Sequence, residues 1–126
     1  MATDLSHLIQ SWLTPSSGPA WQQMHWTPAF DIYRVSNGWL VKFDLAGVRP
    51  GDIEVKVTGR RLIVSGRRGD WVVEESRTCC AYSMEITYSH FERTLELPSN
   101  IDHLLIRTEY RDGMLLVSLH EEGRSE

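Results

Sequence analysis

The sequence predicts an all-β chain that folds as an antiparallel sandwich or barrel. Apolar residues alternate with polar ones over several short segments after residue 27. Turn-forming residues separate these segments, and no helical pattern intervenes between them. Short strands joined in this way are typical of antiparallel two-layer or closed architectures.

The first predicted strands lie on either side of a hairpin turn. Residues 30–35 alternate weakly, and Asn37-Gly38 follows, a pair that predicts a two-residue type I′ turn because both residues tolerate positive φ. The next segment is a clear half-buried strand, because its apolar residues fall on one face. Those residues are Trp39, Val41, Phe43 and Leu45.

The remaining predicted strands follow in order along the chain. After Pro50-Gly51, apolar residues alternate over 53–57, and Gly59 turns the chain into residues 62–64. A polar stretch over 67–83 comes next and contains a short apolar piece at 71–73. Further strands are predicted over 84–88, 91–97, 104–108 and 115–119. Asp112-Gly113 joins the last two as a second type I′ turn.

Length, charge and cysteine content predict one soluble cytoplasmic domain. A chain of 126 residues is long enough for one core, and its net charge of −4 argues against nucleic-acid binding. No apolar run approaches the roughly 18 residues of a membrane span, and no secretory signal is visible. The two cysteines, Cys79 and Cys80, are adjacent, so they cannot staple distant segments, and we expect a reducing compartment.

Residues 1–26 form an N-terminal arm that we expect to be partly helical or disordered. Five apolar residues at helical spacing predict a short amphipathic helix, and the Pro- and Ser-rich residues 14–19 end it. We expect residues 27–121 to be the β-domain and 122–126 a short tail. The apolar residues of the arm are Leu5, Leu8, Ile9, Trp12, Leu13, Trp21, Met24 and Trp26.

Four segments in this order resemble the small heat-shock protein (α-crystallin) family. Residues 44–55 (DLAGVRPGDIEV) resemble the family pattern D-L-P-G-V…D-I-x-V, and residues 62–66 (LIVSG) resemble L-x-I-x-G. Residues 91–98 (FERTLELP) resemble F-x-R-x-x-x-L-P. Residues 106–119 resemble the closing A-x-x-x-n-G-x-L signature. Ala46 replaces the usual proline, and Thr108 the usual alanine.

The resemblance implies an immunoglobulin-like sandwich of two antiparallel sheets that forms a homodimer. The long segment 67–83 resembles the bacterial and plant branch, in which an extra strand pairs with the other subunit. Trp71, Val72 and Val73 would form that strand, and Phe30 and Ile32 would lie in its acceptor. The tail lacks the I-x-I/V motif that links family dimers into shells, which favours a dimer but leaves higher or mixed oligomers open.

The resemblance also implies an ATP-independent holdase that binds unfolding proteins through apolar surfaces. The eight arm residues named above are candidates for client binding, with the alternative that the helical stripe packs on this protein's own sandwich or on a partner subunit. A groove at the sandwich edge is a second candidate surface, with the alternative that its side chains are ordinary core. Its residues are Val55, Val57, Leu104 and Ile106.

A co-chaperone or scaffold module that docks one partner through the edge groove is the alternative function. An enzyme is not expected, because the sequence has no phosphate-binding loop and its histidines lack the spacing of a helical metal site. We therefore expect no cofactor and no metal. Cys79 and Cys80 with His90 could bind a metal or respond to oxidation, but an inert exposed pair in the long polar stretch is the simpler interpretation.

Overall fold

The computed structural model describes residues 25–75 and 78–122, and within these ranges no helix is long and apolar enough to cross a bilayer. The described chain contains seven strands, a 3-10 turn and one short helix. In order they are β1 (Phe30–Val35), β2 (Gly38–Asp44), η1 (Pro50–Asp52), β3 (Ile53–Thr58), β4 (Arg61–Arg67), α3 (Trp71–Glu75), β5 (His90–Glu96), β6 (Leu105–Arg111) and β7 (Met114–His120).

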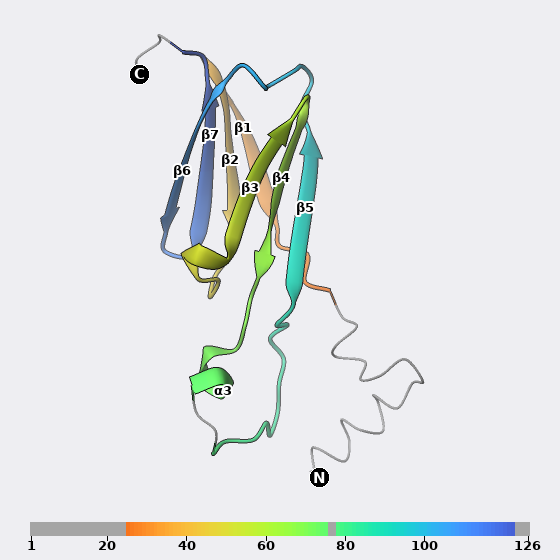
Figure 1. The fold of residues 1–126 in the computed structure, drawn as a ribbon, viewed down its shortest axis with the longest axis vertical. Helices are drawn as coiled ribbons and strands as arrows, with labels where there is room; N and C mark the ends of the chain where they lie inside the picture. The colour runs from red at the N-terminus through yellow and green to blue at the C-terminus, as the bar shows by residue number, and fades with distance from the viewer. Residues whose placement is uncertain (1–24, 76–77, 123–126) are drawn as a thin grey trace.

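The strands form two antiparallel sheets that face each other, as the sequence predicted. One sheet has the order β1-β2-β7-β6 and the other β3-β4-β5. The chain passes from the first sheet to the second after β2 and returns after β5 (Figure 1). β1 and β6 are therefore the edges of the larger sheet, and β3 and β5 are the edges of the smaller one.

The core lies between the two sheets and takes alternate residues from each. Phe43 is opposite Leu115 in one sheet and Leu62 is opposite Leu95 in the other, and all four are buried. Burying a side chain of this size stabilises the fold by roughly 1.5–3 kcal/mol. Within the described residues, the buried core consists of Val41, Phe43, Leu45, Val48, Leu62, Val64, Phe91, Leu95, Leu97, Ile101, Leu115, Val117 and Leu119.

Of the two predicted type I′ turns, one is confirmed and one is wrong by a residue. Asp112 and Gly113 both have positive φ, 54° and 77°, and join β6 to β7. In the first hairpin Gly38 is extended (φ 159°) and pairs with Val35, so Ser36 and Asn37 form the loop. Asn37 is buried there, and its carbonyl accepts a hydrogen bond from the Glu121 N–H at 3.0 Å.

Two other predicted strands are absent from the described chain. Residues 71–73 were predicted to be extended, but they begin α3, because the Asp70 carboxylate caps the helix by accepting the Val72 N–H at 3.1 Å. Residues 84–88 have no regular secondary structure. The β4–β5 ladder ends at the Arg67–His90 pair, so residues 84–88 lie beyond the sheet and have no neighbouring strand within it.

Candidate functional site

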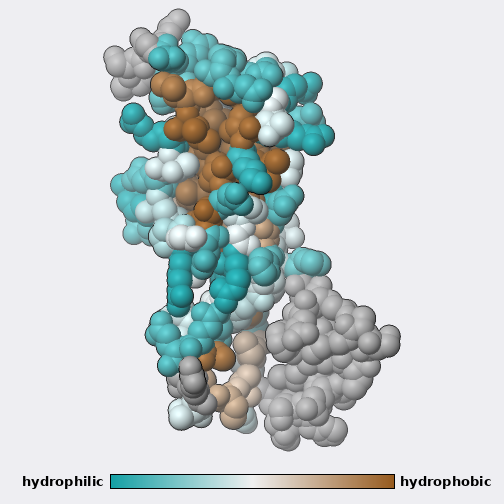
Figure 2. All heavy atoms as spheres, viewed as in Figure 1, coloured by the Kyte–Doolittle hydropathy of each residue, from teal (hydrophilic) through white to brown (hydrophobic). Residues whose placement is uncertain are grey.

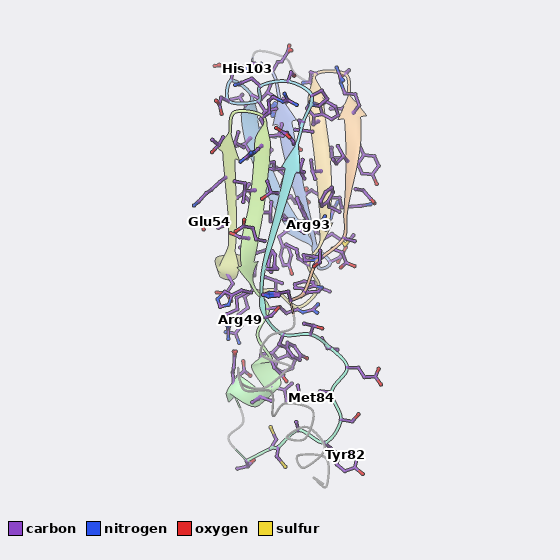
Figure 3. The ribbon with its side chains drawn as sticks, turned by 90° about the vertical axis from the view of Figure 1, so that its right-hand side faces the viewer. Arg49, Glu54, Tyr82, Met84, Arg93 and His103 are labelled. Atoms are coloured by element: carbon purple, nitrogen blue, oxygen red, sulfur yellow. The ribbon has the colours of Figure 1, made fainter. Side chains whose placement is uncertain are left out.

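The long loop, residues 68–89, exposes large apolar side chains outside the sandwich. It extends below the two sheets (Figure 1), with Tyr82 and Met84 in the part farthest from the strands (Figure 3). Tyr82 is 85% exposed. Globular proteins seldom gather so many exposed apolar side chains in one segment without a partner to cover them. The exposed residues in its described part are Trp71, Val72, Val73, Tyr82, Met84 and Ile86.

Helix α3 is attached to the sandwich by its charged residues. Glu74 contacts Arg67 and lies 3.7 Å from the Arg49 guanidinium, and Glu75 lies 3.5 Å from Arg49. These pairs are substantially exposed, so each contributes about 0–1 kcal/mol. The carboxylates therefore hold the helix near the strands while Trp71 remains exposed to solvent.

Strand β1 presents an open edge of the larger sheet. Ile32 is opposite the buried Val41, so it lies on the core face, yet it is 40% exposed. Phe30 packs on Phe43 with ring centroids 5.5 Å apart, under the Arg93 guanidinium. An open edge carries backbone groups that can pair with another chain. The predicted acceptor residues Phe30 and Ile32 thus lie where a further strand fits, and the pairing itself stays a prediction.

The predicted groove residues lie on or beside two further sheet edges, β3 and β6. Val55 and Val57 are half-buried opposite core residues of β4, and Ile106 is opposite the buried Leu119 but remains exposed. Leu104, just before β6, packs against the core. Figure 2 shows a continuous apolar patch in the upper half of this face, over the region of β3 and β6. These four residues are therefore partly core and partly surface, and their binding role stays a prediction.

Trp26 is the one predicted arm residue within the described ranges. Its ring meets Phe91 edge to face at 5.2 Å, and its backbone N–H donates to the Ser89 hydroxyl at 3.1 Å. It is half-buried and packs against the core, so its ring is already occupied by the sandwich. The other proposed client-binding residues, Leu5, Leu8, Ile9, Trp12, Leu13, Trp21 and Met24, lie outside the described residues.

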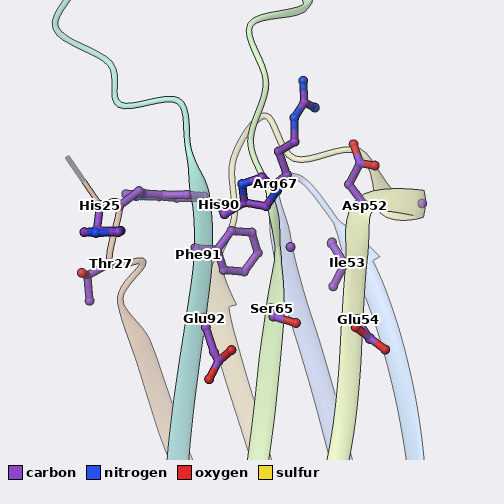
Figure 4. Close-up of a pocket in the computed structure, with 13 residues that line it drawn as sticks. His25, Thr27, Asp52, Ile53, Glu54, Ser65, Arg67, His90, Phe91 and Glu92 are labelled. Carbon is purple, nitrogen blue, oxygen red and sulfur yellow. The ribbon is translucent and has the colours of Figure 1, made fainter. Parts of the chain in front are cut away.

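A shallow polar pocket lies on the outer face of the smaller sheet, close to Trp26. His90 and Arg67 are directly opposite across β4 and β5, and Glu54, Ser65 and Glu92 form the next row across the sheet (Figure 4). The sequence alone did not group these residues, because only the strand register brings them together. Within residues 25–75 and 78–122, no three His, Cys, Asp or Glu side chains are placed to hold a metal ion. Cys79 and Cys80 are exposed in the long loop.

Comparison with known proteins identifies the family to which this sandwich belongs. The sequence pattern of the Hsp20/alpha crystallin family matches residues 31–126. This range contains the described strands β2 to β7 and all of β1 except its first residue, Phe30. This chain belongs to that family. The match confirms the resemblance inferred from the four sequence segments, and it makes the chain a member of a family of stress-response chaperones.

Individual family members show how far the similarity extends. Spore protein SP21 of Stigmatella aurantiaca is 34% identical over 108 residues, which are 86% of this chain and 60% of that protein. Small heat shock protein C2 of Rickettsia felis is 26% identical over 101 residues, which are 78% of this chain and 64% of that protein. The chain therefore spans less than two thirds of the length of these relatives.

Solved structures of family members confirm the sandwich. Heat shock protein 16.0 from Schizosaccharomyces pombe superposes with a TM-score of 0.70 at 25% identity, over 81% of this chain and 93% of that one. The hspA protein of Xanthomonas axonopodis superposes with a TM-score of 0.62 at 26% identity, over 81% of this chain and all of that one. The Hsp20 fold therefore accounts for most of the described chain.

The exposed apolar residues at the end of the long loop were not among the sites expected from the sequence. Tyr82, Met84 and Ile86 occupy every second position, and alternation in this region predicts a strand of the sandwich. The same alternation, placed after a long polar stretch, is also compatible with a strand that pairs with another chain and not with this chain's own sheets. The sequence signal was present, but only the β4–β5 register shows that these residues lie beyond the sheet.

Proposed function

We propose that this Hsp20-family chain is an ATP-independent holdase that keeps unfolding proteins soluble. The observation that carries the proposal is the contrast between a closed core and the exposed apolar side chains of the long loop. Such a surface offers apolar contact area while the protein's own fold stays intact. The family's role in stress supports the same function. We further propose that the protein acts in the cytoplasm, which suits the two exposed thiols.

Binding through such a surface is expected to be weak and reversible. A client that buries about 300 Å² of apolar area gains roughly 7 kcal/mol at about 25 cal/mol per Å². Association itself costs about 4–15 kcal/mol, so one loop holds a client only briefly. Several loops and arms presented together would raise avidity without selecting one client sequence. We include the arm residues before Trp26 in this proposed surface.

The holdase proposal is tested by light scattering from a heat-denaturing test protein. Wild-type chain should suppress scattering, and a variant with Trp71, Val72 and Val73 replaced by Ser should suppress it less, because these exposed residues lie outside the proposed exchange segment. The matched control replaces three polar exposed residues, Thr58, Thr94 and Glu96, by Ser and should behave as wild type. Unchanged scattering with equimolar wild-type dimer would refute the holdase, and equal activity of the two triple variants would remove the long loop from the client surface.

We also propose that two copies exchange a strand, with residues 82–86 as the donor and β1 as the acceptor. Residues 71–73, which the sequence favoured, begin a helix, whereas residues 82–86 present an apolar side chain at every second position beyond the end of the sheet. A strand added to β1 would pair its open backbone groups and cover Ile32. Homodimerisation by this route would hide Tyr82, Met84 and Ile86 and would leave Trp71, Val72 and Val73 as the part of the loop that is exposed to clients.

Analytical ultracentrifugation tests this exchange. Met84→Asp should raise the dimer dissociation constant at least about tenfold, because it would place a charge on the core face of the extended sheet, beside Ile32. Ser83→Asp is the matched control, since its side chain would point away from that face, and it should change the constant little. If Trp71→Asp weakens the dimer and Met84→Asp does not, the donor is the 71–73 segment after all.

The second candidate function is a scaffold module that docks one partner at the β3–β6 edge. The exposure of Ile106 on the core face of β6 favours it, because such a residue offers an apolar contact beside an open strand edge. Ile106→Asp discriminates between the two functions. If the change abolishes partner binding and leaves the suppression of scattering intact, the edge is a docking site separate from the holding surface.

A further inference from the structure

Arg68 joins three separate parts of the chain at the point where the long loop leaves β4. Its side chain contacts the chain entry at Trp26, the loop end at Thr87 and the turn after β2 at Ala46. Its own N–H donates to the Ser89 carbonyl at 2.9 Å. The first residue of the loop is therefore bound directly to the last one.

The guanidinium of Arg68 is held by backbone carbonyls of the described chain. Nε and Nη2 both donate to the Thr87 carbonyl, at 3.0 and 2.7 Å, and Nη1 donates to the Ala46 carbonyl at 3.2 Å. The planar fork of arginine directs three nitrogen donors toward these two carbonyls in one fixed arrangement, which the flexible ammonium of lysine does not match. Desolvation lowers the pKa of Arg68 from its ordinary value, in keeping with a partly enclosed cation.

The same guanidinium stacks on the ring of Trp26. The guanidinium carbon lies 3.6 Å from the ring centroid, which is close contact for a cation–π pair. The backbone N–H of Trp26 donates to the Ser89 hydroxyl, so this residue is connected to the loop end through Arg68 by its side chain and directly by its backbone. The ring of Tyr88 also belongs to the network, with its centroid 5.9 Å from the guanidinium carbon.

We propose that Arg68 is a positioning residue that couples the N-terminal entry of the chain to the end of the long loop. Movement of the arm at Trp26 would then be transmitted to residues 87–89, immediately after the proposed exchange segment. The functional meaning of this coupling rests on the proposed roles of arm and loop, whereas the coupling itself is a property of the single chain. Because coupling is reciprocal, loosening of the loop would equally release Trp26.

The test is a double-mutant cycle on the full chain, read by residue-resolved amide hydrogen exchange. Four chains are compared: wild type, Trp26→Ala, Arg68→Ala and the double variant. The first reporter is the amide at position 68, which donates to Ser89. The second is the amide at position 26, which donates to the Ser89 hydroxyl. We expect each single change to speed exchange of the distant amide about tenfold, because each removes the cation–π contact between Arg68 and Trp26.

The cycle distinguishes coupling from simple loss of contacts. The double variant should exchange no faster than Arg68→Ala alone, because the Trp26 side chain acts on the loop through Arg68, while the backbone bond from position 26 to Ser89 is kept in Trp26→Ala. Strictly additive effects, or an unchanged position-68 amide in Trp26→Ala, would overturn the proposal. If Arg68→Ala fails to fold, the Trp26→Ala variant alone still tests the proposal through the exchange rate of the position-68 amide.

Two further variants separate Arg68 from a general charge effect. Arg67→Ala removes the neighbouring arginine, which contacts Glu74, and should speed exchange in α3 but not at position 26. Arg68→Lys keeps the charge, so the amide at position 26 should exchange more slowly than in Arg68→Ala but faster than in wild type. Equal responses to Arg67→Ala and Arg68→Ala at position 26 would contradict the coupling. Light scattering on the same chains tests the holdase separately, because the exchange cycle is valid whether or not the chain suppresses aggregation.

Discussion

The sandwich and the long loop are stabilised in opposite ways. In the sandwich, apolar side chains from both sheets are buried and the backbone is paired strand to strand. In the described part of the loop, large apolar side chains are exposed, and attachment to the sandwich relies on Arg68 and on the ion pairs of Glu74 and Glu75. The comparison shows that one chain can keep a closed core and still expose apolar side chains, because the two depend on different residues.

The largest expected effect is on the core. Phe43→Ala should lower the free energy of unfolding by about 3–5 kcal/mol, since the side chain is fully buried and leaves a cavity. Tyr82→Ser is the matched change in the loop and should alter the same quantity by less than about 0.5 kcal/mol. Chemical denaturation measures both. A comparable loss in the two variants would mean that the loop belongs to the cooperative core.

The hairpin edge of the sandwich should be the next most sensitive position. A Cβ on Gly38 would overlap the backbone carbonyl of Leu119, so Gly38→Ala should cost about 1–3 kcal/mol as the end of the β2–β7 ladder shifts. Gly51→Ala is the control, because a Cβ added at this position in η1 would meet nothing within 4 Å. Thermal unfolding should give a lower midpoint for Gly38→Ala than for Gly51→Ala. Equal midpoints would contradict the close approach of the Leu119 carbonyl to Gly38.

A smaller effect is expected where the sandwich fixes the turn after β2. The Tyr110 hydroxyl lies 2.8 and 2.7 Å from the carbonyl oxygens of Leu45 and Val48, to which it can donate, so Tyr110→Phe should cost about 1–2 kcal/mol. Burial raises the pKa of Tyr110, so wild type should lose stability as pH rises past the unfolded tyrosine value of about 10. Denaturation at neutral and alkaline pH measures this loss. The variant should lose less, and an identical pH profile would refute the role of the hydroxyl.

The smallest effect is expected from the attachment of the loop. Glu74→Gln removes the ion pairs with Arg67 and Arg49, which are exposed partners. The free energy of local opening of α3 should therefore fall by about 0–1 kcal/mol. Amide exchange should rise in α3 while the unfolding midpoint of the sandwich stays the same. Glu85→Gln, in the same loop, is the control. A lowered midpoint in Glu74→Gln would show that loop and sandwich unfold together.

Much of the fold could be predicted from the sequence because β-alternation reports burial directly. Val41, Phe43 and Leu45 occupy alternate positions and are all buried in the core. The Asp112-Gly113 turn was also predictable, since few residue pairs adopt two successive positive φ angles. The resemblance in four segments was sufficient to indicate the family, which the comparison with known proteins confirmed.

Local signals failed where a distant contact determined the conformation. Asn37-Gly38 has the composition of a type I′ turn, but Glu121 binds the Asn37 carbonyl and Leu119 approaches Gly38, so the turn moves by one residue. Val72 and Val73 favour a strand, but the Asp70 cap and the lack of a neighbouring strand in the described chain leave them helical. In both places a partner far away in the sequence, or the lack of one, outweighs intrinsic propensity.

The sequence by itself determined the all-β class, the order of most strands, the alternation of the core and the family, because each depends on residues close together in the chain. Only the tertiary structure decided which apolar residues remain exposed, which strand edges stay open, and how Arg68 joins Trp26 to Thr87. Those features depend on the register and on the packing of segments far apart in the sequence, and a pattern of residue types carries no information about such distances.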